Sequence, residues 1–203
     1  MKTHRSEILR RWQAVLSSLI LAATLWACGS SAASETSLAE TETVTREHFS
    51  VEVPKITREN GRLNEDAALC YTNLVRGVSV LVIQEPKSDF PEILAENDIE
   101  DVYPADLGGY NALIIDGFGG DTGLSLEDDP LQCDTITLAG MPGIANRFIL
   151  PADNVTFAYD LICLEGQEDY YQLIFFCQEK DTARYADLRK KVLSSFREIP
   201  AGE

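Results

Sequence analysis

Short stretches of alternating or continuous apolar residues recur along most of the chain, and they predict a protein built largely of β-strands. The clearest pair lies at residues 155–164 and 170–177, two apolar runs rich in aromatic and β-branched side chains. A polar turn at residues 165–169 separates them. This pattern predicts two antiparallel strands joined by a short loop.

Five further stretches carry a strand pattern, at residues 49–54, 67–75, 78–85, 132–138 and 144–150. Turn residues lie between several of them, such as Asn60-Gly61 and Arg76-Gly77. The two runs on either side of Arg76-Gly77 are almost continuously apolar, which is typical of strands covered on both faces. We therefore expect a sheet that is packed on both sides.

Helical spacing of apolar residues predicts helices in three places. The first begins near Ser88, and the second is expected over residues 104–118. The third follows a capping residue at Asp181 or Thr182. Its apolar positions are Tyr185, Leu188, Val192, Leu193 and Phe196. With a loop at residues 119–130, the expected order is a strand, a hairpin, two helices, a four-stranded antiparallel meander and a final helix.

The N-terminus has the pattern of an export signal. Residues 1–11 are basic, and residues 12–26 form an uncharged, mainly apolar stretch that is too short for a comfortable membrane span. The stretch leads into Leu25-Trp26-Ala27-Cys28-Gly29. This motif resembles the lipobox of bacterial lipoproteins, which implies cleavage before Cys28 and a diacylglycerol anchor on its thiol. The alternative is a plain secretory signal with an incidental cysteine.

These features divide the chain into four parts. Residues 1–27 are expected to be a lipoprotein signal peptide, and residues 28–46, rich in Ser, Ala, Thr and Glu, a disordered tether. Residues 47–199 are long enough for one domain with its own core, followed by a tail at residues 200–203. The expected location is the bacterial cell envelope, on the exported side of the membrane.

The chain is strongly acidic. Its formal net charge is −16, from 17 Lys and Arg residues against 33 Asp and Glu residues. Residues 1–27 contain four of the bases and one of the acids, so the remainder carries 13 bases, 32 acids and a net charge of −19. Such a surface repels nucleic acid and anionic headgroups and favours a basic protein or a cation as partner. The alternative is that the charge only keeps an exported protein soluble.

Several segments share a pattern with known proteins: residues 49–54 (FSVEVP), 80–82 (VLV), 135–143 (TITLAGMPG), 169–173 (DYYQL) and 193–196 (LSSF). Together they resemble the PsbP/Mog1-like family, over about residues 48–198. The resemblance implies an α+β fold, an α/β/α sandwich whose antiparallel sheet of about six or seven strands has helices on both faces. The family is functionally mixed, so the resemblance implies a fold and no specific activity.

Cysteines beyond the lipobox permit disulfides. Four are present, Cys70, Cys133, Cys163 and Cys177, which allow two bonds in three connectivities. Free thiols buried in apolar strands are the alternative. A turn centred on Gln167 sets Cys163 opposite about Tyr171. By the same register Cys177 lies opposite about Phe157, so we expect that Cys163 and Cys177 do not bond to each other.

Catalytic and metal-binding motifs are sparse in the sequence. Beyond residue 27 the chain has one histidine, His48, and it contains no GxSxG, Walker or HExxH motif and no Cys/His zinc spacing. The densest group of carboxylates consists of Asp116, Asp121, Glu127, Asp128 and Asp129. Oxygen ligands of this kind suit a hard cation, whereas a solvated acidic loop is the alternative.

Three classes of function fit these observations. We expect a membrane-tethered, non-catalytic lipoprotein that acts as a binding or assembly module of the envelope, with no cofactor. The first alternative is an envelope hydrolase, which requires two carboxylates converging in a pocket, at least one with a strongly shifted pKa. The second is a cation-binding lipoprotein that uses residues 116–129.

Overall fold

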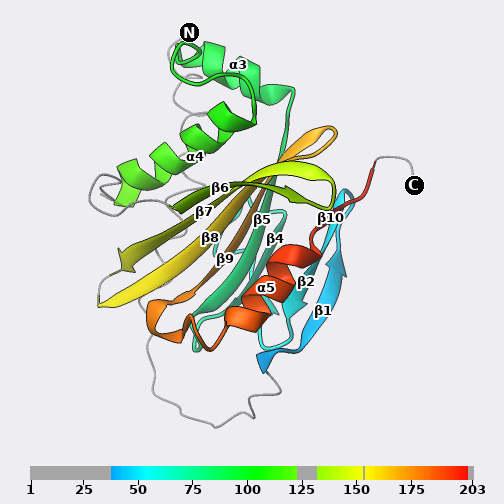
Figure 1. The fold of residues 1–203 in the computed structure, drawn as a ribbon, viewed down its shortest axis with the longest axis vertical. Helices are drawn as coiled ribbons and strands as arrows, with labels where there is room; N and C mark the ends of the chain where they lie inside the picture. Colours follow the sequence, from blue (N-terminus) through cyan, green and yellow to red (C-terminus); the bar gives the residue numbers. More distant parts are fainter. Residues whose placement is uncertain (1–37, 123–131, 153, 201–203) are drawn as a thin grey trace.

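The computed structural model describes residues 38–122, 132–152 and 154–200. Within these residues a main antiparallel sheet of seven strands has the order β3-β4-β5-β9-β8-β7-β6 (Figure 1). The strands are β3 (Arg58–Glu59), β4 (Leu69–Asn73), β5 (Val78–Pro86), β6 (Gln132–Leu138), β7 (Met141–Ala152), β8 (Val155–Glu165) and β9 (Asp169–Gln178). The expected four-stranded meander is confirmed as β6 to β9.

A smaller sheet has the order β1-β2-β10, with β1 at Thr41–Thr45, β2 at Phe49–Pro54 and β10 at Arg197–Glu198. It lies with α5 (Ala186–Ser195) on one face of the main sheet. The other face is covered by α3 (Asp89–Glu96) and α4 (Leu107–Thr122). The structure therefore confirms an α+β sandwich with helices on both faces of an antiparallel sheet.

The alternation of side chains along β9 explains why its sequence is apolar without interruption. Ile174 and Phe176 belong to the core under α3 and α4, whereas Leu173 and Phe175 belong to the core under α5 and the smaller sheet. Successive side chains of a strand point to opposite faces, so a central strand between two layers has no polar side. The strand β5 alternates in the same way, with Leu81 in the first core and Val82 in the second, which confirms the prediction that the strands beside Arg76-Gly77 are covered on both faces.

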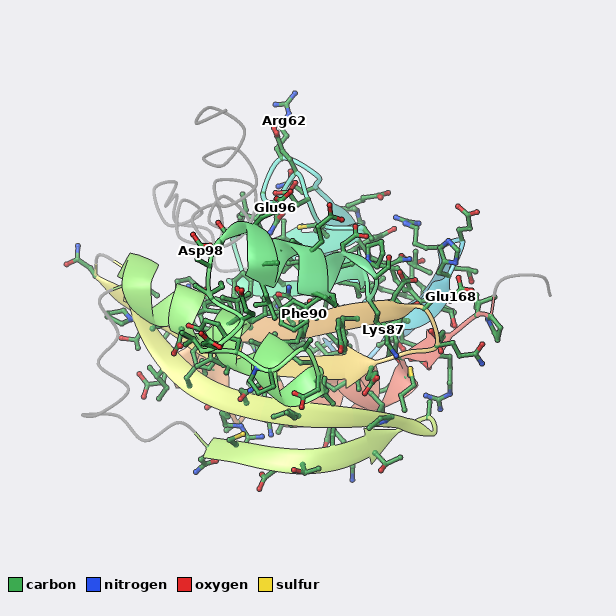
Figure 2. All side chains as sticks on the ribbon, turned by 90° about the horizontal axis from the view of Figure 1, so that it is seen from above. Arg62, Lys87, Phe90, Glu96, Asp98 and Glu168 are labelled. Carbon is green, nitrogen blue, oxygen red and sulfur yellow. The ribbon has the colours of Figure 1, made fainter. Side chains whose placement is uncertain are left out.

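Aromatic contacts fasten α3 to the sheet. Phe90, only 1% exposed, meets Tyr110 of α4 and Tyr170 of β9 edge-to-face, with ring centroids 5.5 Å and 5.9 Å apart. Figure 2 shows Phe90 between α3 and the sheet, while Glu96 lies on the outer side of the helix. The helix is thus amphipathic, as the spacing from Ser88 predicts.

The strand assignments differ from the sequence prediction in several places, since the short strands β3 and β10 were not predicted and β7 begins at Met141 instead of residue 144. Thr41–Thr45 was expected within the disordered tether, but it forms β1, which pairs with β2 along its full length. The Thr and Glu side chains of this segment give no alternation of apolar and polar residues, so the pattern did not predict a strand. Thr and Val nevertheless favour extended conformations. In addition, a single antiparallel sheet was expected, whereas β2 lies in a second, smaller sheet.

Two helix boundaries also differ. α4 begins at Leu107, after Asp106 accepts a 2.9 Å hydrogen bond from the backbone N–H of Gly109, and not at Pro104. It then continues to Thr122, so the first residues of the expected loop are helical. α5 begins at Ala186, later than the expected cap at Asp181 or Thr182, because a 3₁₀ turn at Glu179–Asp181 precedes it.

Candidate functional site

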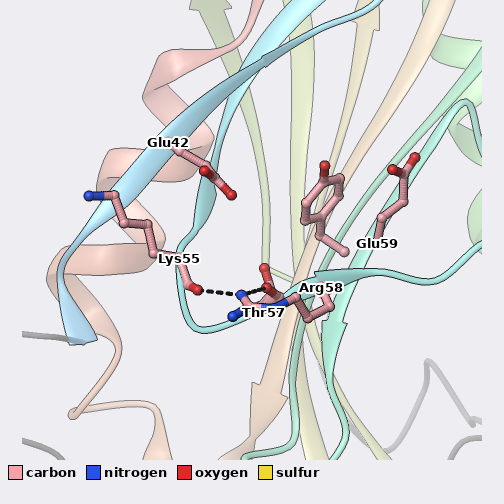
Figure 3. Close-up of a pocket in the computed structure, with 6 residues that line it drawn as sticks. Glu42, Lys55, Thr57, Arg58 and Glu59 are labelled. Carbon is pink, nitrogen blue, oxygen red and sulfur yellow. Dashed lines mark hydrogen bonds between the residues drawn. The ribbon is translucent and has the colours of Figure 1, made fainter.

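A polar cleft of about 550 Å³ lies beside β1, β2 and β3 (Figure 3). Its lining residues are Glu42, Lys55, Thr57, Arg58, Glu59 and Tyr71. The turn after β2 shapes it, since the backbone N–H and the hydroxyl of Thr57 both donate to the Pro54 carbonyl, over 2.9 Å and 2.6 Å. The volume suits a small ligand, but the walls are mostly charged and polar, unlike the apolar lining of most ligand pockets.

The charged side chains of the cleft are engaged by their neighbours. Arg58 donates to the backbone carbonyls of Lys55 and Thr57 over 2.8 Å and 2.7 Å. The ammonium of Lys55 pairs with Glu40 at 3.2 Å. Bases and acids therefore alternate around the cleft, so it has no charge of one sign with which to select an anion or a cation. We interpret it as a polar surface between two sheets.

A second polar group lies between α4 and the main sheet. The Tyr110 hydroxyl donates to Glu85, and the Gln172 amide donates to the Tyr110 hydroxyl over 3.0 Å and to Glu85 over 3.2 Å. Gln172 is 1% exposed, and its carbonyl oxygen has no hydrogen-bond partner among the described residues. These bonds connect α4 to β5 and β9.

Burial raises the pKa of the Glu85 carboxyl to about 7, although the hydrogen bonds from Tyr110 and Gln172 act in the opposite direction. The negative charges of Asp66 and Asp89 raise it further. A carboxylate hydrolase requires a second carboxylate that converges with the shifted one in a pocket. Glu85 instead contacts a tyrosine and a glutamine, and it is not among the residues that line the cleft. We interpret this group as a polar part of the packing of α4.

The third feature is a separation of charge along the chain. Residues 88–146 contain 13 Asp and Glu residues and no Lys or Arg. The rest of the chain after residue 27 holds all 13 bases and 19 acids. The segment of α3, α4 and β6 therefore carries −13 of the net charge of −19. Such a one-signed surface produces a field that attracts and orients partners of opposite charge.

Eight of these acids lie on α3, on α4 and on the loop between them, and the structure shows each of them exposed: Asp89, Glu92, Glu96, Asp98, Glu100, Asp101, Asp106 and Asp116. We call this surface the acidic layer. Its inner side is apolar, because Phe90, Leu94 and Ile114 are buried against the sheet. Figure 2 shows Glu96 and Asp98 on this part of the molecule. The layer thus presents only carboxylates as its charged groups.

The acids that were expected to form a cation site are only partly described. Asp116 is exposed, and it accepts a 2.8 Å hydrogen bond from the Tyr103 hydroxyl. The side chain of Asp121 and residues 127–129 lie outside the described part of the chain. In the part that is described, no three His, Cys, Asp or Glu side chains converge as metal ligands. The cation site at residues 116–129 stays a prediction.

The four cysteines are free thiols. The observed register places Cys163 opposite Gln172 and Cys177 opposite Ala158, one residue from the expected partners. Cys177 also belongs to the opposite face of the sheet from Cys70 and Cys163. Disulfide bonding needs Cα atoms within about 7 Å, whereas β5 and β9 separate the strands of Cys70 and Cys163.

Cys133 differs from the alternative in which all four free thiols are buried in apolar strands. It lies on the edge strand β6 and is exposed, whereas Cys70, Cys163 and Cys177 are buried. Because β7 separates β6 from β8, Cys133 is also not in position to bond Cys163. Burial raises the pKa of the Cys70 thiol to about 11 and that of Cys177 to about 12, which makes both unreactive at neutral pH.

The predicted anchor is not part of the described structure. The lipobox and Cys28 lie outside the described residues, so lipidation stays a prediction. Among the helices of the described segments, none combines the length and hydropathy that are needed to cross a bilayer.

Sequence reasoning missed both the acidic layer and the buried group at Glu85. The first had a readable signal, a run of 59 residues from Ser88 to Asn146 without a single Lys or Arg. The second did not, because Glu85, Tyr110 and Gln172 come from three distant segments that only the folded sheet brings together.

Comparison with known proteins shows the fold. No family model and no curated protein matches the sequence. The solution structure of cyanobacterial PsbP (CyanoP) from Synechocystis aligns with a TM-score of 0.51 and 13% identity, over 86% of this chain and 99% of that one. At this identity the likeness confirms the expected PsbP-like fold and leaves activity open.

Two further solved structures are more distant. LpqN of Mycobacterium tuberculosis, a protein involved in cell envelope biogenesis, aligns with a TM-score of 0.42 and 13% identity, over 79% of this chain and 91% of that one. A protein of Bacteroides thetaiotaomicron aligns with a TM-score of 0.43 and 12% identity over 76% of this chain, which spans only 46% of the Bacteroides chain.

Proposed function

We propose that this protein is a non-catalytic lipoprotein of the bacterial envelope, tethered to the membrane at Cys28, and that it acts as a binding or assembly module for a basic protein. The observation that carries this proposal is the acidic layer. Eight exposed carboxylates lie on two helices and their connecting loop, in a segment of the chain that contains no base. A partner with clustered Lys or Arg residues is the protein that such a surface would attract.

The position of the layer supports docking of a partner rather than a role in the core. α3 buries Phe90 and Leu94 toward the sheet and turns Glu92 and Glu96 outward. A partner can therefore contact the carboxylates without displacing any core residue. A lipid tether would add to a weak contact of this kind, because confinement near the membrane raises the local concentration of a partner that is also held there.

The test is a crosslinked pull-down from envelope fractions at low and high salt, with the mature chain carrying Cys28→Ser as bait. We expect capture of a basic protein that weakens as salt is raised, because screening shortens the range of charge interactions to about 8 Å at physiological ionic strength. Capture of an acidic partner that is indifferent to salt would contradict the electrostatic part. Turnover of an envelope substrate by the purified protein would contradict the non-catalytic part.

A further inference from the structure

An exposed apolar pair lies at the tip of the β4–β5 hairpin. Among the described residues, the large apolar side chains that are exposed are Leu74 at 45%, Val75 at 75% and Val102 at 63%. Leu74 and Val75 are adjacent in the tight turn between β4 and β5, whereas Val102 lies alone in the loop between α3 and α4. Two neighbouring apolar side chains at a projecting turn can enter an apolar phase together.

Basic side chains border this tip. Arg76 follows Val75 directly and hydrogen-bonds the Tyr185 hydroxyl. The guanidinium of Arg184 lies 6.0 Å from the centroid of the Tyr185 ring. The Gly77 carbonyl accepts a 3.1 Å hydrogen bond from the Gln178 backbone N–H, which brings the connection from β9 to α5 to the same end of the sheet.

Lys180 lies on that connection, in the 3₁₀ turn that also contains Glu179 and Asp181. The surroundings of the tip are therefore mixed in charge, with the bases Arg76, Lys180 and Arg184 alongside the acids Glu179 and Asp181. This mixture differs from the acidic layer, which has no base at all.

The chain enters the domain beside the same tip. The Asn73 side chain donates a 2.6 Å hydrogen bond to the Ile56 carbonyl, and the Lys55 backbone N–H donates a 2.9 Å bond to the Glu40 carbonyl. These two bonds place residue 40, at the start of β1, next to the β4–β5 turn. Leu38 lies only ten positions after Cys28. A fully extended segment of that length reaches about 35 Å, so an anchor at Cys28 would hold this end near the membrane.

The acidic layer begins at the opposite end of the main sheet. β5 runs nine residues from Val78, beside the tip, to Pro86, just before α3. At about 3.4 Å per residue this strand separates the two ends by roughly 30 Å. In Figure 1 the starts of β1 and β5 lie at the lower end of the molecule, and α3 lies at the upper end.

We propose that Leu74 and Val75 insert into the interfacial region of the membrane that carries the anchor, with Arg76 at the level of the lipid phosphates. This contact points the α3 end of the acidic layer away from the membrane, toward a partner. The proposal rests on the lipid anchor of the proposed function. The overall charge opposes a broad electrostatic contact with anionic lipid, so the contact is confined to the tip and depends on the anchor.

The proposal can be tested with single tryptophan residues as fluorescent reporters, because no other tryptophan contributes to the emission. Both tryptophans of the sequence, Trp12 and Trp26, precede Cys28, so the mature chain has none. Mature chains carrying Cys133→Ser, together with Val75→Trp or Val102→Trp, are coupled through Cys28 to a maleimide lipid in phosphatidylcholine vesicles. Tryptophan emission is then compared in vesicles of ordinary and brominated lipid. The chemical coupling makes the result independent of whether cells lipidate Cys28.

We expect the tryptophan at position 75 to shift to shorter wavelength and to lose most of its emission in brominated vesicles. The tryptophan at position 102, which is also an exposed site but lies in the α3–α4 loop, is expected to do neither. Adding Leu74→Asp to the Val75→Trp chain is expected to restore its emission. Equal quenching of both reporters, or of neither, would overturn the proposal. So would a shift of the Val75→Trp emission that requires added envelope protein, because the tip would then bind protein.

Discussion

The ring of Phe196 stacks on the ring of Phe49, with centroids 5.6 Å apart and an interplanar angle of 20°. Phe196 immediately follows α5, and Phe49 begins β2, so this contact fastens the final helix to the smaller sheet. Both rings are fully buried, and Tyr171 of the main sheet meets each of them. The three aromatic residues therefore join the two sheets and α5 in one core.

Phe196→Ala is expected to lower the free energy of unfolding by about 3–5 kcal/mol, because it leaves a cavity in this core. Phe157→Ala is a matched control, since the Phe157 ring is only half-buried and is expected to cost clearly less. Urea unfolding followed by circular dichroism measures both. A loss below about 1 kcal/mol for Phe196→Ala would show that α5 is peripheral to the fold.

Glu85 is expected to make the stability depend on pH. Its pKa is about 7 in the folded protein, against an ordinary value of 4.5. The folded state therefore holds the proton more tightly than the unfolded chain. The resulting stabilisation is fully present below about pH 4.5 and is lost as pH rises through 7.

Glu85→Gln removes this ionisation while its amide oxygen keeps an acceptor for the Tyr110 hydroxyl. We expect the variant to gain stability relative to the wild type as pH rises from 4.5 to 8, by a difference on the order of 1–3 kcal/mol. Glu92→Gln, on the exposed face of α3, serves as the control and should follow the wild type. Urea unfolding at a series of pH values decides the matter, and parallel curves for Glu85→Gln and wild type would contradict the assignment.

The thiols are expected to fall into two classes. In a chain carrying Cys28→Ser, a thiol reagent at neutral pH should modify Cys133 at once, because it is exposed on β6. The buried thiols Cys70, Cys163 and Cys177 should react only after denaturation. Peptide mapping after timed labelling identifies the modified positions. Recovery of any two of these residues as a disulfide in the native protein would contradict the strand register.

The sequence pattern predicts the β-strands of the main sheet well, because their side chains record their surroundings. The run from Tyr170 to Cys177 is apolar on both faces since a layer covers each face. The sequence pattern does not predict β1, because its Thr and Glu side chains are mostly exposed. Backbone pairing with β2 holds this strand in place. Backbone pairing leaves little trace in the hydrophobic pattern of an edge strand.

The candidate site was less predictable than the fold. Total charge suggested a basic partner, but only the folded chain shows that the acids of residues 89–116 share two helices and their loop on one side of the sheet. The sequence pattern placed Leu74 and Val75 at the end of an apolar strand and did not predict that they are exposed. Its exposure follows from the tight turn around Gly77, whose φ is +57°. Both the acidic layer and the exposed tip depend on how distant segments are arranged in the fold, which a local sequence pattern does not record.

Lipidation of Cys28 is expected to be detectable directly. Mass spectrometry of the protein from the membrane fraction should show a diacylglycerol adduct on an N-terminal Cys28, as the lipobox-like motif implies. Cys28→Ser should abolish the adduct and release the protein from the membrane fraction. An unchanged membrane level of the Cys28→Ser protein would contradict the anchor, because the tip at Leu74 and Val75 is too small to hold the domain alone.

The acidic layer is the surface on which the proposed docking of a basic partner depends. Two variants separate its location from total charge, because each removes four negative charges from exposed side chains. The layer variant carries the substitutions Glu92→Gln, Glu96→Gln, Glu100→Gln and Asp101→Asn. The matched control carries Glu47→Gln, Glu168→Gln, Glu179→Gln and Asp187→Asn, all outside the layer.

The decisive measurement is the amount of basic partner that each variant captures from crosslinked envelope at low salt. The layer variant is expected to lose most of the capture, and the control is expected to retain it, because only the layer variant removes carboxylates from α3 and the α3–α4 loop. Equal capture by both variants, or an equal loss in both, would contradict docking at the acidic layer.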